Sequence, residues 1–154
     1  MYQIYNVNNS PKSVIECAKY IHSKWGSQEN YSYFENAILN SGKTEDSIPQ
    51  FYVLVNGDEI VGCFGLIIND FVSRHDLYPW FSSLFIEPEH RGNRLSKTMF
   101  DYASKVVKSM GYSCMYLTTD HTSFYEKFGW VRIEDAYELS GEATRVYCRA
   151  VAHA

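Results

Sequence analysis

The sequence predicts an α+β fold with a mixed, mostly antiparallel central sheet and helices on both faces of that sheet. Two observations lead to this prediction. β-rich runs at Phe51–Val55 and Ile60–Ile68 flank Asn56-Gly57-Asp58, and Asn-Gly between such runs is the strongest short signal for an antiparallel hairpin. A strand, a long amphipathic helix and another strand then follow one another over Trp80–Thr118, which predicts a parallel pair with a right-handed crossover.

The N-terminal part of the chain is expected to form a strand and two helices before the hairpin. Gln3–Val7 is the expected first strand. Ser10-Pro11 is expected to open the first helix, because serine can cap a helix and proline is tolerated in the first turn. A second helix is expected at Ser32–Leu39, and the polar stretch Lys43–Ser47 is expected to be an exposed loop.

Strands and helices alternate in the rest of the chain. Leu95–Met110 is the clearest helix, since its apolar residues fall on one face and Gly111 stands in the position of a C-cap. The other expected elements are strands at Trp80–Ile86, Cys114–Thr118, Trp130–Ile133 and Thr144–Val151, and a short helix at Ser123–Phe128.

The composition is that of one ordinary globular domain spanning residues 1–154, with 45% hydrophobic and 21% charged residues. A net charge of −4 argues against non-specific binding to nucleic acid or to an anionic membrane. The apolar runs are too short to cross a bilayer, and the first residues lack the pattern of a signal peptide. We therefore expect a cytoplasmic protein without a nucleic-acid or membrane partner.

The cysteines and histidines do not indicate a metal site. Cys17, Cys63, Cys114 and Cys148 are scattered and form no CxxC pair, so free thiols are expected. The five histidines, His153 among them, also lack the spacing of metal ligands. No metal is expected.

The segment SSLFIEPEHRGNRLSKTMF, at 82–100, places a strand, a polar turn and a long helix in succession. A helix N-terminus presents unpaired N–H groups and a partial positive charge, so such a turn can bind phosphate. Arg91 and Arg94 add full positive charges there. The alternative is a solvated helix start with an ordinary turn glycine, and this segment alone is weak evidence against it.

A second segment, FYEKFGW at 124–130, favours the phosphate-binding turn over the ordinary helix start. Together with FIEPEHRGNRLS it resembles the GNAT superfamily of N-acetyltransferases. The phosphate-loop pattern of that superfamily is Gln/Arg-x-x-Gly-x-Gly/Ala after a strand, and Arg91 matches its first position. Its later signature is Tyr-Glu-Lys, a hydrophobic residue, Gly and an aromatic, which Tyr125–Trp130 matches. The resemblance is close over roughly residues 50–135, and the element order fits over the whole chain.

The chain departs from the phosphate-loop pattern at two positions. Arg94 stands where the family has Gly, and Ser96 where it has Gly or Ala. A positive φ at Arg94 would cost about 1–2 kcal/mol, whereas helical geometry would cost nothing and let the guanidinium pair with a phosphate. We expect the helical geometry. Ser96 is small enough to fit, and its hydroxyl would add a hydrogen-bond donor.

The resemblance implies acetyl-CoA as a co-substrate. Its pyrophosphate would lie on Arg91, Gly92, Asn93, Arg94, Leu95 and Ser96. Its pantetheine arm would lie along Leu84, Phe85 and Ile86, in a gap where that strand splays from Cys114–Thr118, and would use the backbone as an added strand does. A backbone N–H near Phe85 would polarise the thioester carbonyl.

The resemblance also implies Tyr125 as the catalytic residue that protonates the departing CoA thiolate. A phenol of pKa about 10 is protonated at pH 7 and can serve as that acid. The alternative is that Tyr125 only packs, as most of the 13 tyrosines must. An alkyl amine has a pKa near 10.4, so a base or a water chain must deprotonate it before attack.

The general base is not singled out by the sequence. The acidic and histidine residues near expected strand ends are His75, Asp76, Glu87, Asp120 and His121. Asp120 could equally cap the short helix that follows it. A water-relayed base stays open, and the absence of a G-x-S-x-G motif argues against a serine hydrolase.

Aromatic residues are dense where the amine acceptor would bind. They are Trp25, Tyr31, Tyr33, Phe34, Tyr78, Trp80 and Phe81. Aromatic walls suit a cationic amine through cation–π contacts, but these residues could equally pack the helices onto the sheet.

The expected function is transfer of an acetyl group from acetyl-CoA to a primary amine of a small molecule, by direct attack in a ternary complex. Two alternatives stay open. One is a non-catalytic module that binds CoA or another ligand, and the feature that supports it is Arg94 in place of the family's Gly. The other is a protein N-acetyltransferase. The oligomeric state is undetermined by the sequence, with a homodimer as one candidate.

Overall fold

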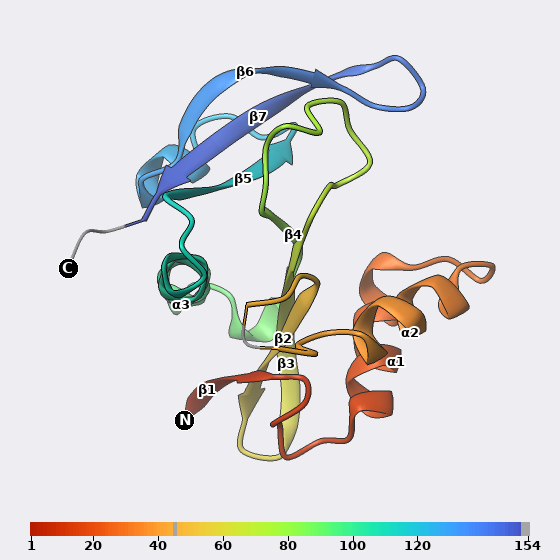
Figure 1. The fold of residues 1–154 in the computed structure, drawn as a ribbon. Helices are drawn as coiled ribbons and strands as arrows, with labels where there is room; N and C mark the ends of the chain where they lie inside the picture. Colours follow the sequence, from red (N-terminus) through yellow and green to blue (C-terminus); the bar gives the residue numbers. More distant parts are fainter. Residues whose placement is uncertain (45, 152–154) are drawn as a thin grey trace. The chain divides into compact units, whose positions relative to one another are not determined.

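The computed structural model describes residues 1–44 and 46–151 (Figure 1). Glu45, in the loop expected at Lys43–Ser47, and His153 lie outside the described residues. The strands are β1 (Tyr2–Asn6), β2 (Gln50–Asn56), β3 (Glu59–Ile67), β4 (Trp80–Ile86), β5 (Cys114–Thr119), β6 (Val131–Tyr137) and β7 (Ala143–Ala150). The helices are α1 (Val14–Trp25), α2 (Tyr31–Leu39), α3 (Leu95–Ser109) and the short 3-10 helices η1 (Pro88–His90) and η2 (Tyr125–Phe128).

The strands form one seven-stranded sheet in the order β1-β2-β3-β4-β5-β7-β6. The pairs β1–β2, β2–β3, β5–β7 and β6–β7 are antiparallel. Strands β4 and β5 are parallel, with Trp80 opposite Tyr116. The predicted mixed, mostly antiparallel sheet is therefore confirmed, as is the hairpin at Asn56-Gly57-Asp58, where Gly57 supplies a φ of +65°.

The chain divides into two compact units. The N-terminal unit contains Met1–Leu66 and Ser83–Ser96, and the C-terminal unit contains Ile67–Ser82 and the described chain from Lys97. Strand β4 contributes to both, since Trp80–Ser82 belong to the C-terminal unit and Ser83–Ile86 to the N-terminal unit.

The core of the N-terminal unit lies between its strands and the pair α1–α2, which pack on each other (Figure 1). Val53, Leu54 and Phe64 of the hairpin are fully buried, and so is Ile21 of α1. The rings of Tyr52 and Phe64 stack across the hairpin with their centroids 4.9 Å apart. Burial of both faces explains why β2 reads as a continuous apolar run rather than an alternating one.

Helix α1 begins three residues later than the sequence prediction. Its N-cap is Ser13, whose hydroxyl accepts a hydrogen bond from the Glu16 N–H at 3.1 Å. The Glu16 carboxylate reaches back to the Ser13 backbone, which completes a capping box. The Ser10 hydroxyl instead bonds the backbone of Lys12, so Ser10-Pro11 precedes the helix as a turn.

The C-terminal unit has a core rich in aromatic residues. Phe81, Phe100 and Trp130 are buried and make edge-to-face contacts, with ring centroids 5.2–6.1 Å apart. Helix α3 confirms the predicted segment, and Met99, Ala103 and Val107 of its predicted apolar face are fully buried. Phe100 is also buried, although the helical pattern did not assign it to that face.

The short helix predicted at Ser123–Phe128 forms over fewer residues. Ser123 has a φ of +64°, which a right-handed helix excludes, so η2 starts at Tyr125. Gly129 ends it with a φ of +86°, as its place after the Tyr-Glu-Lys-Phe run predicts.

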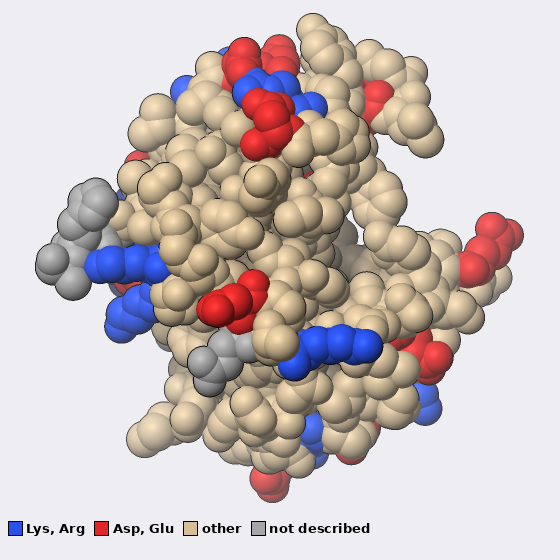
Figure 2. Space-filling view, in the orientation of Figure 1, with Lys and Arg blue, Asp and Glu red and all other residues tan. Residues whose placement is uncertain are grey.

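Three further features concern membrane spans, cysteines and surface charge. Among residues 1–44 and 46–151, no helix is long and apolar enough to span a membrane. The four cysteines are free, with Cys17 and Cys63 buried and the other two half-buried. On the face drawn in Figure 2, positive and negative side chains lie beside one another rather than in a patch of one sign.

The capping box predicts the effect of one substitution. We expect Ser13→Ala to lower the free energy of unfolding by about 1 kcal/mol, because the Glu16 N–H loses its acceptor. Ser23→Ala is the matched control in the same helix, since the Ser23 hydroxyl only bonds back to the Tyr20 carbonyl. Urea unfolding measures both variants, and an equal effect of the two would contradict the cap.

Candidate active site

The turn before α3 is exposed and has an unusual backbone. After η1 the chain is extended at Arg91, and Gly92 then takes a φ of +89°. An ideal Cβ at Gly92 would meet no atom within 4 Å, so a ligand can approach the backbone there. The side chains of Arg91, Asn93 and Arg94 are exposed, and α3 begins at Leu95.

The expectation of helical geometry at Arg94 is wrong. Arg94 has a φ of +57°, which lies in the left-handed region that favours glycine. The reason is local: the chain turns at Gly92 and Arg94 before it enters the helix, so the position that the family fills with Gly does need a positive φ. We assign this conformation a cost of about 1–2 kcal/mol.

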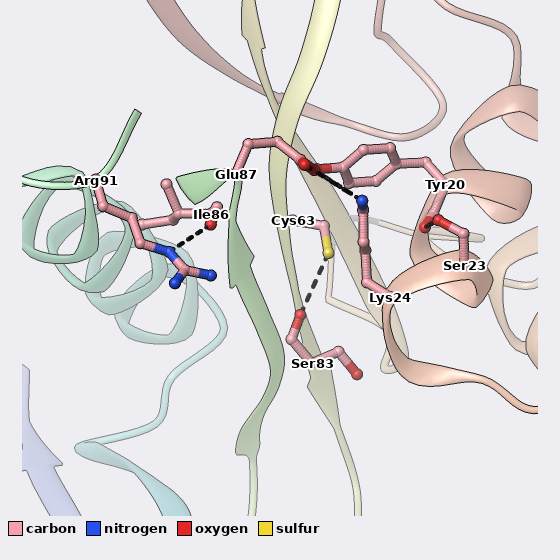
Figure 3. A network of polar contacts seen from close by, with 8 residues as sticks. All are labelled: Tyr20, Ser23, Lys24, Cys63, Ser83, Ile86, Glu87 and Arg91. Carbon is pink, nitrogen blue, oxygen red and sulfur yellow. Dashed lines mark hydrogen bonds and ion pairs between the residues drawn. The ribbon is translucent and has the colours of Figure 1, made fainter. Parts of the chain in front are cut away.

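Several contacts hold the turn in place on the N-terminal unit. The Arg91 Nε–H donates to the Ile86 carbonyl at 2.8 Å (Figure 3). Its guanidinium lies 5.4 Å from the centre of the Phe85 ring. The Asn93 amide donates to the His90 carbonyl at 3.0 Å. His90 Nδ1 shares a hydrogen bond of 2.8 Å with the Tyr2 hydroxyl. The turn is therefore tied to both β1 and β4.

Glu87, the residue after β4, is the centre of a polar cluster with helix α1 (Figure 3). The Tyr20 hydroxyl donates to its carboxylate at 2.7 Å, and the Lys24 ammonium lies 2.9 Å from the same oxygen. The Lys24 ammonium is also 4.9 Å from the centre of the Phe85 ring. Phe85 thus contacts two cations, Lys24 and Arg91.

The cluster disfavours Glu87 as a general base. The hydrogen bond from Tyr20, followed by that from Lys24, lowers the pKa of Glu87 below its usual range. A carboxylate stabilised in its charged form is a weaker proton acceptor. Glu87 instead connects α1 to the end of β4, and neither Tyr20 nor Lys24 was identified from the sequence.

Strand β4 is irregular at its centre. Ser83 has a φ of +56°, and its carbonyl accepts a hydrogen bond from the Cys63 thiol at 3.3 Å (Figure 3). Burial raises the pKa of the Cys63 thiol, so it is an unreactive structural donor. The neighbouring Ser82 hydroxyl is buried without a hydrogen-bond partner among the described residues. The pantetheine segment expected at Leu84–Ile86 therefore follows a kink that the sequence did not indicate.

Tyr125 lies in the C-terminal unit, on η2, and is half-buried among aromatic rings. Its ring centroid is 4.9 Å from that of Phe124 and 5.9 Å from that of Phe100. Burial raises the pKa of Tyr125, although a hydrogen bond with the Thr119 side chain acts in the opposite direction. The phenol is therefore protonated at neutral pH, as a proton donor must be.

The remaining base candidates differ in their partners. Arg74 donates two hydrogen bonds to the Asp76 carboxylate, at 3.0 and 2.9 Å, and lowers the pKa of Asp76, which is therefore a poor base. His75 is exposed on the same loop. Asp120 and His121 are exposed after β5, and the His121 N–H donates to the Thr119 hydroxyl. Asp120 does not cap η2, whose N-cap position is Phe124.

The expected aromatic wall is only partly available to a ligand. Trp80 and Phe81 are buried in the C-terminal unit, so of the two alternatives the packing role holds for them. Tyr78 of the same unit is 43% exposed. In the N-terminal unit, Trp25 and Tyr33 are 51% and 55% exposed. Tyr31 and Phe34 are half-buried, with their rings packed edge-on against His22.

Metal-ligating side chains are not gathered in the described part of the chain. Within residues 1–44 and 46–151, no group of three or more His, Cys, Asp or Glu side chains is placed to hold a metal ion.

A family model described as an acetyltransferase (GNAT) domain matches residues 47–132, which is more than half of the chain. The chain belongs to the GNAT acetyltransferase family. The matched range includes the turn at Arg91–Arg94 and the Tyr125 segment. No curated protein matches this GNAT chain by sequence.

Solved structures share the GNAT fold at low sequence identity. An acetyltransferase of the GNAT family from Staphylococcus aureus Mu50 is 21% identical, with a TM-score of 0.65 over 99% of this chain and 100% of that chain. An aminoglycoside 6'-acetyltransferase type Ii is 19% identical, with a TM-score of 0.71 over 100% and 99%. An aminoglycoside 6'-N-acetyltransferase complexed with coenzyme A is 17% identical, with a TM-score of 0.69 over 100% and 98%.

The Glu87 cluster gives this GNAT protein a predictable pH dependence. Because the pKa of Glu87 is lower in the folded than in the unfolded state, its stabilising effect is present above the unfolded value of about 4.5. The effect is lost as pH falls through the folded value. We expect Glu87→Gln to lower stability by about 1 kcal/mol at pH 7 and to flatten the acid side of the profile.

Urea unfolding from pH 7 to pH 3 measures this effect. Glu89→Gln is the matched control, because Glu89 is exposed two residues further along the chain. Parallel stability profiles for wild type and Glu87→Gln would contradict the assignment of the cluster.

Proposed function

We propose that the protein is an N-acetyltransferase that moves the acetyl group of acetyl-CoA to a primary amine of a small molecule, within a ternary complex. The observation that carries the proposal is the exposed turn with two arginines and an open glycine at the start of α3, in a chain of the GNAT family. Two supporting comparisons are the aminoglycoside acetyltransferases of the same fold, one of them complexed with coenzyme A.

On the donor side, the pyrophosphate would bind Arg91, Gly92, Asn93, Arg94, Leu95 and Ser96. The residues fit this group because the turn is exposed, the space above Gly92 is open, and two guanidiniums are close by in sequence. The pantetheine arm would follow Leu84, Phe85 and Ile86. The side chains of Leu84 and Phe85 are half-buried, so part of their surface is available.

The nitrogen loses two protons in the reaction, and the sulfur gains one. A base first removes a proton from the ammonium form of the acceptor. The neutral nitrogen then attacks the thioester carbonyl, the carbon–sulfur bond breaks, and the acetylated nitrogen loses its second proton to a base. Tyr125 would protonate the thiolate sulfur as it leaves. For the base we propose His75, Asp120 or His121, directly or through water, since Glu87 and Asp76 are held in ion pairs.

The cellular setting and the partners are proposals of the same kind. With a net charge of −4 and mixed charges on the face drawn in Figure 2, we place the enzyme in the cytoplasm without nucleic-acid or membrane partners. A homodimer is the candidate assembly.

One observation favours a second function. Arg94 has the positive φ that glycine would have at this position, so the backbone follows the same path. Its long side chain, however, occupies space that a glycine would leave open. A turn of this kind could bind CoA for regulation without turnover. Donor binding without amine-dependent thiol release would support that function instead.

The phosphate turn is tested by an isosteric pair of substitutions. Gly92→Asp should weaken acetyl-CoA binding about tenfold relative to Gly92→Asn, because only Asp sets a negative charge against the pyrophosphate. Both residues tolerate the positive φ at this position. Isothermal titration calorimetry gives the two affinities. Equal affinities would contradict the assignment of the pyrophosphate to this turn.

The catalytic role is tested by Tyr125→Phe in an assay of thiol release from acetyl-CoA against a panel of amines. We expect kcat to fall at least tenfold while acetyl-CoA affinity is unchanged, because only the proton donor is lost. Tyr137→Phe is the control, since Tyr137 is an exposed tyrosine of β6 in the same unit. An unchanged kcat in Tyr125→Phe would overturn the general-acid role.

A further inference from the structure

Arg149, on β7 of the C-terminal unit, joins three elements through one guanidinium. Its side chain is 13% exposed. Its Nε–H donates to the Phe128 carbonyl at 2.9 Å, and its two Nη groups donate to the Ser104 hydroxyl and the Asp101 carboxylate, both at 2.7 Å. Asp101 and Ser104 lie on neighbouring turns of α3, whereas Phe128 ends η2. The guanidinium therefore connects α3 to the turn that carries Tyr125.

The carbonyl that Arg149 holds is at the end of η2. The last carbonyls of a helix have no partner within the helix, and here the chain leaves at once through the left-handed Gly129. Arg149 supplies the missing donor. Tyr147, two residues earlier on β7, donates its hydroxyl to the Glu126 carboxylate at 3.0 Å. Strand β7 thus holds η2 at two points.

The ring of Phe100 links the same guanidinium to the Tyr125 side chain. The Arg149 guanidinium lies 5.8 Å from the centre of the Phe100 ring, and the Tyr125 ring packs 5.9 Å from that ring. The Asp101 carboxylate balances the charge of Arg149 and is itself held by the Lys97 ammonium at 2.6 Å. Both the backbone beneath Tyr125 and the ring beside it therefore depend on the position of Arg149.

We propose that Arg149 is a positioning residue for Tyr125, fixing the η2 turn and the Phe100 ring so that the phenol is held in one orientation. The inference rests on the proposed role of Tyr125 as proton donor. Lysine cannot replace the arginine, because its ammonium lacks the planar fork that reaches three acceptors at once. A misplacement of about 1 Å is enough to cost up to about 100-fold in rate.

A double-mutant cycle in the thiol-release assay tests this inference. The variants are Arg149→Lys, Tyr125→Phe and the two combined. We expect Arg149→Lys to lower kcat about tenfold with the KM for acetyl-CoA unchanged. In the Tyr125→Phe background it should cause no further loss, because the group that it positions is already absent. Thermal unfolding confirms that each variant is folded at the assay temperature.

Two further variants keep the test decisive. Arg132→Lys is the control, since Arg132 forms a half-exposed ion pair with Asp135 in the same unit and should leave kcat unchanged. Ser104→Ala removes one of the three contacts and replaces Arg149→Lys if that variant does not fold.

The outcomes separate this inference from the proposed function. One outcome is that Tyr125→Phe slows the reaction and the double variant loses kcat by the product of the two single-variant losses. Another is that Arg149→Lys changes only KM, or nothing. Either outcome overturns the positioning role and leaves the proposed function standing. If Tyr125→Phe itself leaves kcat unchanged, the general-acid role is overturned, and the positioning role with it.

Discussion

The candidate donor site depends on where strand β4 ends. Trp80–Ser82 pack in one compact unit and Ser83–Ile86 in the other, and the positive φ of Ser83 falls at the change between them. The Cys63 thiol holds the carbonyl of that kinked residue. At the end of the strand, the Ile86 carbonyl holds Arg91, and Glu87 attracts two side chains of α1. The turn before α3 thus takes its position from the backbone and the charges at the end of β4.

Much of the fold could be predicted because its signals are local. The Asn56-Gly57 turn, the apolar face of α3 and the glycine after η2 each depend on a few adjacent residues, and the observed bounds agree within one or two positions. The start of α1 was missed although the sequence contains the signal. Ser13 and Glu16 have the spacing of a capping box, and Ser10-Pro11 competed with it as a helix start.

The candidate site was less predictable because its contacts are long-range. The motif residues followed from the family resemblance, but the partners of Glu87 lie 67 and 63 positions away, on a helix that no local pattern places beside β4. The positive φ of Arg94 depends on how η1 is joined to α3, which residue identity does not reveal. For Trp80 and Phe81 the sequence left both a site role and a core role open, because aromatic residues pack in cores as readily as they line sites.

The Phe85 ring has a consequence for how this sequence can vary during evolution. One ring contacts Lys24 on α1 and Arg91 in the turn, and an aromatic ring attracts both cations whereas an aliphatic side chain attracts neither. The solved relatives described above differ from this chain at about four positions in five. Against so much divergence, positions 24, 85 and 91 should change together: an aliphatic residue at 85 should accompany the loss of one of the two cations.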